Sequence, residues 1–235
     1  SKTWLVPLPR DVGVIVVAAG RGMRFGGEVP KQFQLLAGVP VLLHALHPFL
    51  AHADVANVIV VVPDDIVAEP PEWLREVRGD RLLLVAGGRE RSDSVRAGLA
   101  ALPPECSVVL VHDGARPFPS RAIIDLGIDA VRRGHSAVPA LPIRDTVKRA
   151  DDFGRVLSTV DRKGLWRAQT PQAFPRRTID RAHAAIAIGE PASDDSVLVE
   201  RLGEHVELFP GSARNLKITS VQDLVLAAWY AEQSP

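Results

Sequence analysis

The sequence predicts an α/β fold built on a single doubly wound, mostly parallel sheet. Four short runs are apolar and β-branched at consecutive positions, which is typical of strands covered on both faces. They are residues 12–18, 55–62, 82–85 and 108–111. Between and after them, apolar residues recur at helical spacing at residues 41–50, 66–77, 94–102 and 123–131. Strands and helices that alternate in this way form a parallel sheet with helices on both faces.

A β-hairpin arm is expected to protrude from this unit at about residues 143–165. There a polar turn, Ala150 to Gly154, joins two short segments at residues 146–149 and 156–160. A two-stranded hairpin is marginally stable in water by itself, so we expect the arm to pack on another surface, most simply that of a homodimer partner. The rest of the chain predicts a helix at 194–202, a strand at 206–209 and a helix at 221–230. With no internal repeat and no linker, residues 1–235 are expected to form one domain.

Composition excludes several classes of protein. Hydrophobic residues make up 46% and charged residues 24%, which is typical of a globular chain with a sizeable core. The 28 basic residues are balanced by 28 acidic ones, so net charge does not favour nucleic acid as a partner. Cys106 is the one cysteine, which excludes an internal disulfide. No apolar run approaches the roughly 18 residues of a membrane span, and the sequence predicts a cytoplasmic protein with no membrane contact.

The loop after the first predicted strand has the composition of a phosphate-binding loop. Gly20 and Gly22 let backbone N–H groups approach phosphates, while Arg24 and Lys31 bring cationic donors to the same place. Lysine is scarce in this chain, with five against 23 arginines, so each lysine is a candidate for a specific role. Two glycines in a loop are also compatible with a plain strand-to-helix turn.

A second glycine pair, Gly87-Gly88, follows the third predicted strand. Removing side chains here would let a flat base lie against the backbone, and Arg91 and Ser94 follow directly. A helix cap explains one of the polar residues equally well. The pair of glycines beside two arginines nevertheless indicates a nucleotide site.

Asp113 at the end of the fourth predicted strand is the candidate ligand for Mg²⁺. A hard ion prefers oxygen ligands, and a carboxylate at a buried strand tip is a common way to hold it against nucleotide phosphates. An Asx turn or an ion pair with Arg116 is the competing interpretation. His112 is expected to be structural, because Mg²⁺ prefers oxygen to imidazole.

Residues nearer the carboxyl end can hold a second, smaller phosphate and its hydroxyl groups. Thr146 and Arg162 lie on the expected arm, Thr170 follows closely, and Lys217 is isolated in an apolar stretch. Strand propensity explains the two threonines as well, and a solvated lysine remains an alternative for Lys217.

Together these segments resemble the 2-C-methyl-D-erythritol 4-phosphate cytidylyltransferase family of the non-mevalonate isoprenoid pathway. The motifs are Ala-Ala-Gly-x-Gly-x-Arg with Pro-Lys-Gln at 18–32, Val-His-Asp-x-Ala-Arg-Pro at 111–117, Asp-Thr-x-Lys-Arg at 145–149, and Thr-Val-Asp-Arg-x-x-Leu-Trp at 159–166 followed by Thr-Pro-Gln at 170–172. The chain departs from the family at Gly114, where alanine is usual, and at Ser193-Asp194-Asp195, where the family more often has Thr-Asp-Glu or Thr-Asp-Asp. Some relatives carry this unit fused to a cyclodiphosphate synthase.

The resemblance implies a Rossmann-like nucleotidyltransferase fold, CTP and a polyol phosphate as substrates, and Mg²⁺ as cofactor. By position it implies that Arg24, Lys31 and Lys217 surround the transferred phosphoryl group and that Asp113 holds the metal. The cytidine contacts that it implies are Ala18, Ala19, Gly88 and Ser94. The residues that it implies for the second phosphate are Arg116, Thr146, Arg162 and Thr170, some of them contributed through the arm of a dimer partner.

Other functions remain open from the sequence. A cytidylyltransferase acting on ribitol or ribulose 5-phosphate shares most of these motifs. A nicotinamide-dependent oxidoreductase is disfavoured because the first loop has Phe25 where a third glycine is needed, and because no acid follows roughly 20 residues later at the end of a second strand. A nucleotide-binding subunit without catalysis is a further alternative, which metal-dependent pyrophosphate release would exclude.

Overall fold

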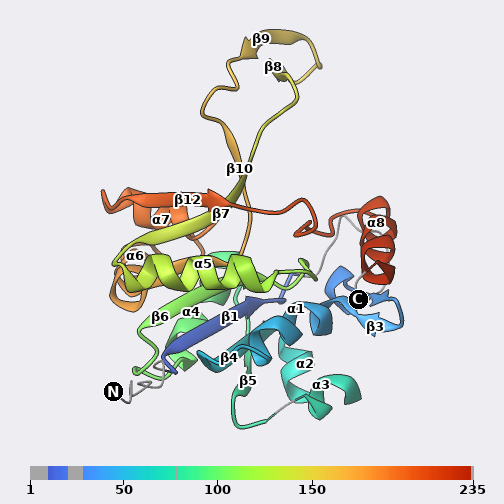
Figure 1. Cartoon of the computed structure of the whole chain (residues 1–235), viewed down its shortest axis with the longest axis vertical. Helices are drawn as coiled ribbons and strands as arrows, with labels where there is room; N and C mark the ends of the chain where they lie inside the picture. The colour runs from blue at the N-terminus through green and yellow to red at the C-terminus, as the bar shows by residue number, and fades with distance from the viewer. Residues whose placement is uncertain (1–9, 21–28, 78, 234–235) are drawn as a thin grey trace, which may run out of the picture.

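A mixed sheet forms the centre of the protein in the computed structural model, which describes residues 10–20, 29–77 and 79–233 (Figure 1). The strand order is β5-β4-β1-β6, continued by β11 (Gln172–Pro175) and β7 (Ser136–Pro142). Two further strands, β10 (Trp166–Ala168) and β12 (Val206–Pro210), also pair with β7. β1 (Val12–Val17), β4 (Val55–Val62), β5 (Leu82–Ala86) and β6 (Val108–Asp113) are mutually parallel. These are the four strands that the sequence predicts. Every residue of β6 is buried, as expected for a strand covered on both faces.

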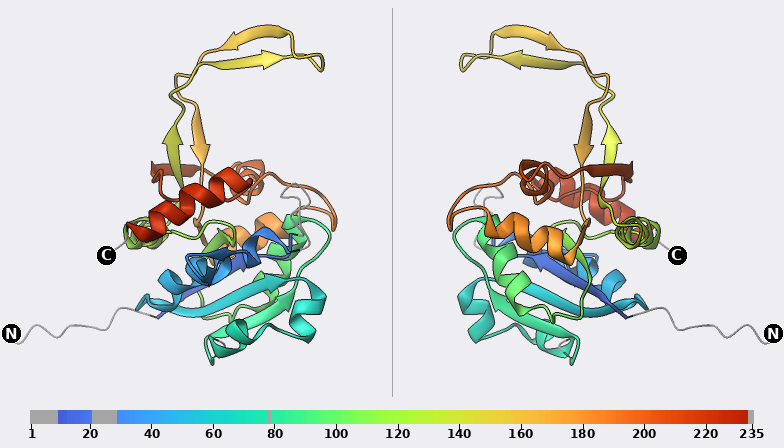
Figure 2. Two further views of the ribbon diagram at one scale, coloured as in Figure 1. Left: turned by 90° about the vertical axis from the view of Figure 1, so that its right-hand side faces the viewer. Right: turned by 90° about the vertical axis from the view of Figure 1, so that its left-hand side faces the viewer.

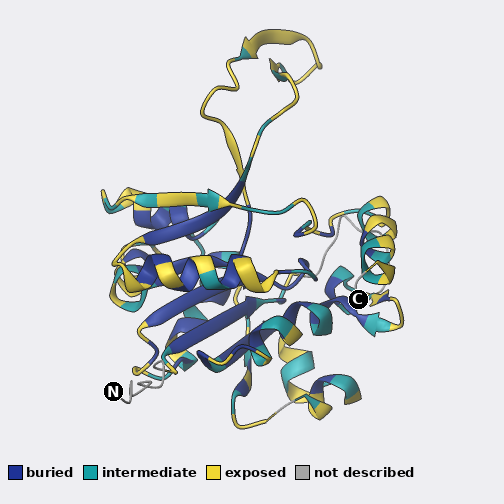
Figure 3. Ribbon diagram, in the orientation of Figure 1, coloured by how far each residue is buried: buried dark blue, intermediate teal, exposed yellow. Residues whose placement is uncertain are grey.

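Helices cover both faces of this sheet and complete two apolar cores. On one face α1 (Val41–Leu50) and α5 (Arg121–Arg132) contribute Leu46 and Ile124. On the other, α4 (Arg91–Ala101), α6 (Arg176–Ala184) and α7 (Ser196–Arg201) contribute Val95, Ile179 and Leu198. Figure 3 shows the buried strands between these layers. The doubly wound arrangement predicted from the sequence is confirmed.

The helix predicted at residues 66–77 is wrong as one element. The structure has two single-turn helices, α2 (Asp64–Ala68) and α3 (Glu72–Glu76), separated by Pro70 and Pro71. Proline lacks an N–H and disfavours the helical conformation of the residue before it, so two prolines in succession end the first helix.

Several short elements were not predicted. β7 (Ser136–Pro142), β10 (Trp166–Ala168) and β11 (Gln172–Pro175) are short or contain proline, and β11 lies antiparallel between β6 and β7. Residues 31–40 form a short 3-10 helix, η1 (Lys31–Phe33), and a small hairpin of β2 (Leu35–Leu36) and β3 (Val39–Pro40). β12 (Val206–Pro210) and α8 (Val221–Glu232) lie within one or two residues of the predicted bounds.

The predicted hairpin arm is present as β8 (Val147–Ala150) paired with β9 (Val156–Val160). It projects away from the sheet in every view (Figures 1 and 2). The arm is largely exposed within this chain, and Phe153 at its turn has 84% of its surface accessible. In the part of the chain that the structure describes, no helix is both long enough and apolar enough to cross a membrane.

Candidate active site

The carboxyl ends of β1 and β6 open into a cavity of about 640 Å³. Parallel α/β sheets bind ligands at this edge, because several strands deliver their following loops to one place. The residues predicted for a nucleotide that line the cavity are Ala18, Ala19, Gly20, Lys31, Gly88, Arg91, Ser94, Asp113 and Lys217. Gly22 and Arg24 lie outside the described residues.

A smaller cavity of about 140 Å³ adjoins the first. Arg91, Asp113 and Lys217 line both cavities, while Arg116 and Thr170 line the smaller one. A guanidinium, a carboxylate and an ammonium therefore lie between two spaces. Two anionic ligands, one in each space, would meet at these three side chains.

Asp113 is surrounded by cations. Its carboxylate lies 2.9 Å from Lys217 Nζ, 3.3 Å from Arg91 Nε and 3.8 Å from Arg116 Nε. Burial would raise the pKa of Asp113, but the charges of Arg91, Lys217 and Arg116 outweigh it and hold this pKa well below its usual range. The carboxylate is ionised at any physiological pH, and the local excess of positive charge favours anionic ligands.

The first loop is held by a residue to which the sequence assigned no role. Gln32 is buried, and its Nε2 donates hydrogen bonds to the carbonyl oxygens of Ala18 at 2.7 Å and of Gly20 at 2.8 Å. Its neighbour Lys31 stands at the start of η1 and lines the cavity. Gln32 therefore ties the loop after β1 to the segment that carries the lysine.

The second glycine pair lets two loops approach closely. A Cβ at Gly87 would collide with the Cβ of Ala19 and lie 2.9 Å from the hydroxyl oxygen of Ser94. The hydroxyl of Ser94 accepts a hydrogen bond from the N–H of Gly88 at 3.2 Å and lies 3.3 Å from the carbonyl of Glu90. Ser94 thus orders this loop from inside the cavity, with lone-pair capacity left for a ligand.

Thr170 supports the strand tip that carries Asp113. Because His112 Nε2 donates to the carbonyl oxygen of Arg116 at 2.9 Å, its Nδ1 can accept the hydroxyl proton of Thr170 at 3.0 Å. The Thr170 oxygen accepts the backbone N–H of Asp113 at 3.0 Å. Burial lowers the pKa of His112 to about 4, so the ring is neutral. For Thr170 to donate a hydrogen bond to a phosphate, its hydroxyl proton would have to turn away from His112 Nδ1.

Lys217 is held at the site by the segment before it. Asn215 is buried, and its Nδ2 donates to the carbonyl oxygen of Thr170 at 2.8 Å. The carbonyl oxygen of Asn215 accepts a hydrogen bond from Arg116 Nη1 at 2.7 Å. The apolar neighbour Ile218 is fully buried. The sequence indicated Lys217 by its scarcity, whereas Asn215 could be found only once the fold brought it beside Thr170.

Within this chain the arm residues do not reach either cavity. Thr146 and Arg162 are exposed near the base of the arm, and Arg162 donates to the carbonyl oxygen of Arg144. Their predicted contact with a second phosphate stays a prediction that requires the arm of another copy.

The residues at Asp113 fit a magnesium ion. Among the described residues, no three or more His, Cys, Asp or Glu side chains are grouped so that they could hold a metal by themselves. Mg²⁺ does not need such a cage, because it is usually bound by one or two carboxylates, several waters and the phosphates of its substrate. One ionised carboxylate facing a cavity lined by phosphate-type donors matches that requirement.

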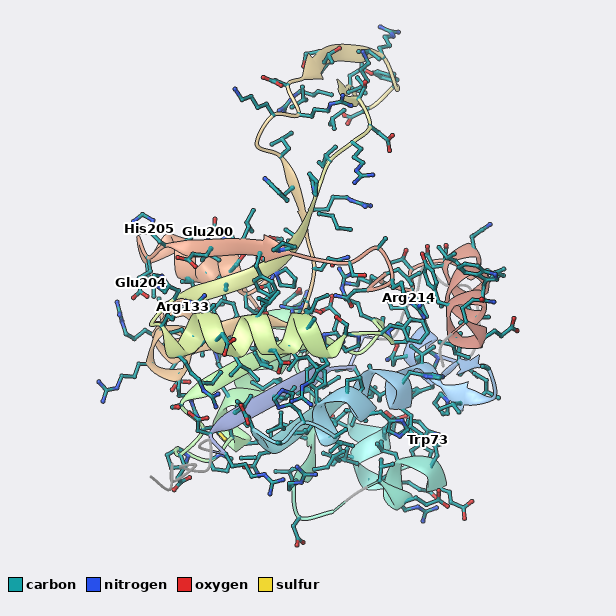
Figure 4. The ribbon with its side chains drawn as sticks, viewed as in Figure 1. Trp73, Arg133, Glu200, Glu204, His205 and Arg214 are labelled. Atoms are coloured by element: carbon teal, nitrogen blue, oxygen red, sulfur yellow. The ribbon has the colours of Figure 1, made fainter. Side chains whose placement is uncertain are left out.

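Another cavity of similar size has the opposite character. It measures about 650 Å³ and lies between β7, β12 and α7. Glu200, Glu204 and His205 line it and lie at one end of β12, away from Arg214 beside α8 (Figure 4). Asp194 lines both this cavity and the smaller cavity beside Asp113, where three cationic side chains offset its charge. An acidic lining repels phosphates, so the cavity at Asp113 is the candidate active site.

Comparisons with known proteins show the family of this chain. The family profile described as 2-C-methyl-D-erythritol 4-phosphate cytidylyltransferase matches residues 12–233. The chain belongs to this family. A curated member from Syntrophus aciditrophicus is 44% identical over 223 residues, which are 92% of this chain and 94% of that protein. A "Bifunctional enzyme IspD/IspF" from Rhodospirillum rubrum is 46% identical over 217 residues, 91% of this chain and 55% of that longer protein.

Solved structures of family members share the fold. The enzyme titled 2-C-methyl-D-erythritol 4-phosphate cytidylyltransferase from Thermus thermophilus is 36% identical, with a TM-score of 0.77 over 93% of this chain and 98% of that chain. A 4-diphosphocytidyl-2C-methyl-D-erythritol synthase from Anaerococcus prevotii is 29% identical, with a TM-score of 0.79 over 94% and 98%. The resemblance stated from the sequence motifs is confirmed.

Proposed function

We propose that this chain transfers CMP from CTP to 2-C-methyl-D-erythritol 4-phosphate, giving 4-diphosphocytidyl-2-C-methyl-D-erythritol and pyrophosphate. The observation that carries the proposal is the pair of adjoining cavities that share Arg91, Asp113 and Lys217. CTP occupies the larger cavity, with its base between the Ala18-Ala19 loop and Gly88. The acceptor phosphate occupies the smaller one, beside Arg116. Family membership supports both substrates.

The protein's task in this reaction is to align two anions. An oxygen of the acceptor phosphate attacks the α-phosphorus of CTP, a new P–O bond forms, and the bond to the β-phosphate oxygen breaks to release pyrophosphate. The attacking oxygen is already anionic, so no general base is required. Lys31 and Lys217, with Arg24 as the sequence predicts, stabilise the charge that develops on the α-phosphate. Arg91 and Arg116 offset the repulsion between the two phosphates.

Asp113 is the residue that would hold Mg²⁺. The ion would neutralise charge on the CTP phosphates when it is bound. Lys217 Nζ lies 2.9 Å from Asp113 Oδ2, so a metal ion bound to this oxygen would weaken that contact. The phosphates of CTP offer Lys217 replacement oxygens.

A homodimer would complete the acceptor site. Phe153, Val156 and Leu157 on the arm expose 84%, 61% and 62% of their surfaces, which favours burial against a second copy. Thr146 and Arg162 of that copy would then approach the smaller cavity. Sedimentation velocity measures this directly: we expect a dimer, and a monomer for Phe153→Asp that is folded by circular dichroism. A monomeric unaltered chain with full activity would contradict the proposal.

The decisive experiment is a pyrophosphate-release assay with each nucleoside triphosphate, Mg²⁺ and a panel of polyol phosphates. We expect release only with CTP and fastest with 2-C-methyl-D-erythritol 4-phosphate. Faster turnover of ribitol or ribulose 5-phosphate would instead support the alternative acceptors. A preference for ATP or GTP would contradict the base assignment, and binding without release would indicate a nucleotide-binding subunit.

A further inference from the structure

Arg91 is held between two carboxylates on different elements. Its Nε donates to Asp113 Oδ1 at 3.3 Å, and its Nη1 donates to Asp195 Oδ2 at 2.7 Å. The other oxygen of Asp195 lies 3.0 Å from Nε2 of His183, which is on α6. A continuous chain of Asp113, Arg91, Asp195 and His183 thus runs from the cavity into the layer formed by α6 and α7.

The far end of this chain is closed to solvent. The side chains of Asp195 and His183 are 1% and 2% exposed, whereas that of Arg91 is 23% exposed and lines both cavities. An ionised carboxylate at such depth has a large desolvation cost, which only well-placed partners offset. Burial would raise the pKa of Asp195, but Arg91 and His183 outweigh it and lower this pKa below its usual range. Asp195 is therefore a permanent negative charge behind Arg91.

Local helix chemistry does not account for Asp195. It stands at the N-cap of α7, where an aspartate normally accepts a hydrogen bond from the first turn, yet its side chain makes no such bond. The preceding Asp194 does that instead, accepting the N–H of Val197 at 3.1 Å. The carboxylate of Asp195 is free to turn inward, and it is used wholly on Arg91 and His183.

We propose that Asp195, itself oriented by His183, is a positioning residue for the transfer reaction that acts through Arg91. Because Asp195 holds Nη1, Arg91 donates to Asp113 through Nε alone and does not bind it through two donors. Only one donor of Arg91 then bonds Oδ1 of Asp113, so the carboxylate keeps lone pairs for a metal, and the contact of its Oδ2 with Lys217 can exchange. Arg91 Nη2 is buried with no hydrogen-bond partner among the described residues, so one donor of the guanidinium is unused.

The inference rests on the proposed function, and its test compares variants in the same assay. Asp195→Asn keeps the shape of the side chain and removes its charge. We expect kcat to fall by about 10- to 100-fold, as when the support of a ligand residue is lost, with a smaller change in the KM for CTP. Asp195→Glu restores the charge and recovers most of kcat. In Arg91→Ala, adding Asp195→Asn costs nothing further, because a residue acting through Arg91 has nothing left to act on.

Asp54→Asn is the matched control. Asp54 is also buried and paired with an arginine, Arg132, at 2.9 Å. It directly precedes β4, so it lies at the amino-terminal ends of the parallel strands, whereas the cavities lie at their carboxyl ends. A merely structural role for Asp195 predicts that both variants lose activity only in proportion to lost stability. Equal losses in the two, or additive losses in Arg91→Ala with Asp195→Asn, would overturn the proposal.

Two further measurements separate this inference from the proposed function. The first is the rate at which the Nε hydrogen of Arg91 exchanges with water, measured by NMR without substrate and assigned with the Arg91→Lys variant. We expect this rate to rise in Asp195→Asn and to stay unchanged in Asp54→Asn. Unchanged exchange in both refutes the positioning role even if the enzyme turns over. If Asp195→Asn does not fold, His183→Leu and His183→Gln replace it: the first should lower kcat, and the second, which keeps an N–H donor, should not. Equal kcat in these two would also refute it.

Discussion

Replacing Asp113 by asparagine tests the charge balance on which the site depends. The substitution leaves three cationic side chains, those of Lys217, Arg91 and Arg116, around a neutral amide. Removing one partner of a buried ion pair costs about 3–5 kcal/mol, because the remaining charge is left without compensation. Lys217 is 39% exposed, so water screens part of its charge, and Arg91 keeps its partner Asp195 at 2.7 Å. We therefore expect the lower end, about 3 kcal/mol.

Thermal unfolding measures this loss. For a chain of this size, 1 kcal/mol corresponds to roughly 2–4 °C, so Asp113→Asn should lower the Tm by about 6–12 °C in metal-free buffer. Asp180→Asn is a suitable control, because Asp180 pairs with Arg176 at 2.9 Å on α6 and its own side chain is 45% exposed. Exposed pairs contribute about 1 kcal/mol or less, so the control should shift by a few degrees at most.

Pyrophosphate distinguishes a cation cluster from general damage. It supplies anionic oxygens to the three cations, so it should raise the Tm of Asp113→Asn by more than it raises that of the unaltered chain. A variant as stable as the unaltered chain, or one that pyrophosphate fails to stabilise, would refute the assignment of Asp113 as the counter-charge of this cavity.

Three further predictions concern other parts of the site. Lys31→Ala should lower the rate of pyrophosphate release by a factor of about 10² to 10³ with little change in Tm. Removal of the exposed Arg201 side chain should leave the rate unchanged. A Lys31→Ala rate within about threefold of the unaltered chain would contradict the role of Lys31 in stabilising the α-phosphate. Gly87→Ala should raise the KM for CTP because its Cβ meets Ala19, whereas Gly79→Ala, which has open space, should not. Folding lowers the pKa of His112 to about 4, so the folded state favours the neutral ring. The free energy of unfolding therefore has its full value above the pKa of the unfolded chain and falls as the pH is lowered below it. In urea unfolding, titration of this ring should lower the free energy of unfolding by about 2 kcal/mol between pH 7 and pH 5. His112→Gln should not show this loss. The same pH dependence in the variant and the unaltered chain would refute the assignment.

The four parallel strands of the first half could be predicted from the sequence because they are buried on both faces. Such strands are continuous apolar runs, and β4 (Val55–Val62) and α1 (Val41–Leu50) have the predicted bounds. The second half carries weaker signals. β11 (Gln172–Pro175) is four residues long and ends in proline, and its place between β6 and β7 depends on partners that are distant in the sequence. Pairing of that kind leaves no local periodicity.

The site divides along the same line. Gly88 and Asp113 could be placed at the cavity because each follows a recognisable strand, where chemistry is expected, and Lys31 was indicated by the scarcity of lysine. Gln32, Asn215 and Asp195 could not be given roles, because each acts by a hydrogen bond to a segment brought near only by folding. Residues that contact a ligand often carry a compositional signal, whereas residues that orient them look like ordinary polar side chains.

The charge arrangement explains why such supporting residues are needed. Three cations share one carboxylate at Asp113, and each could collapse onto it in a way that blocks both a metal and a phosphate. The structure prevents this by giving two of them a second anchor: Arg91 is held by Asp195 at 2.7 Å, and Arg116 by the carbonyl oxygen of Asn215 at 2.7 Å. Lys217 has the longest flexible stem free to move, and its backbone is fixed through Asn215. The cation best able to exchange Asp113 for a phosphate is therefore Lys217, while the two arginines keep their places during the transfer.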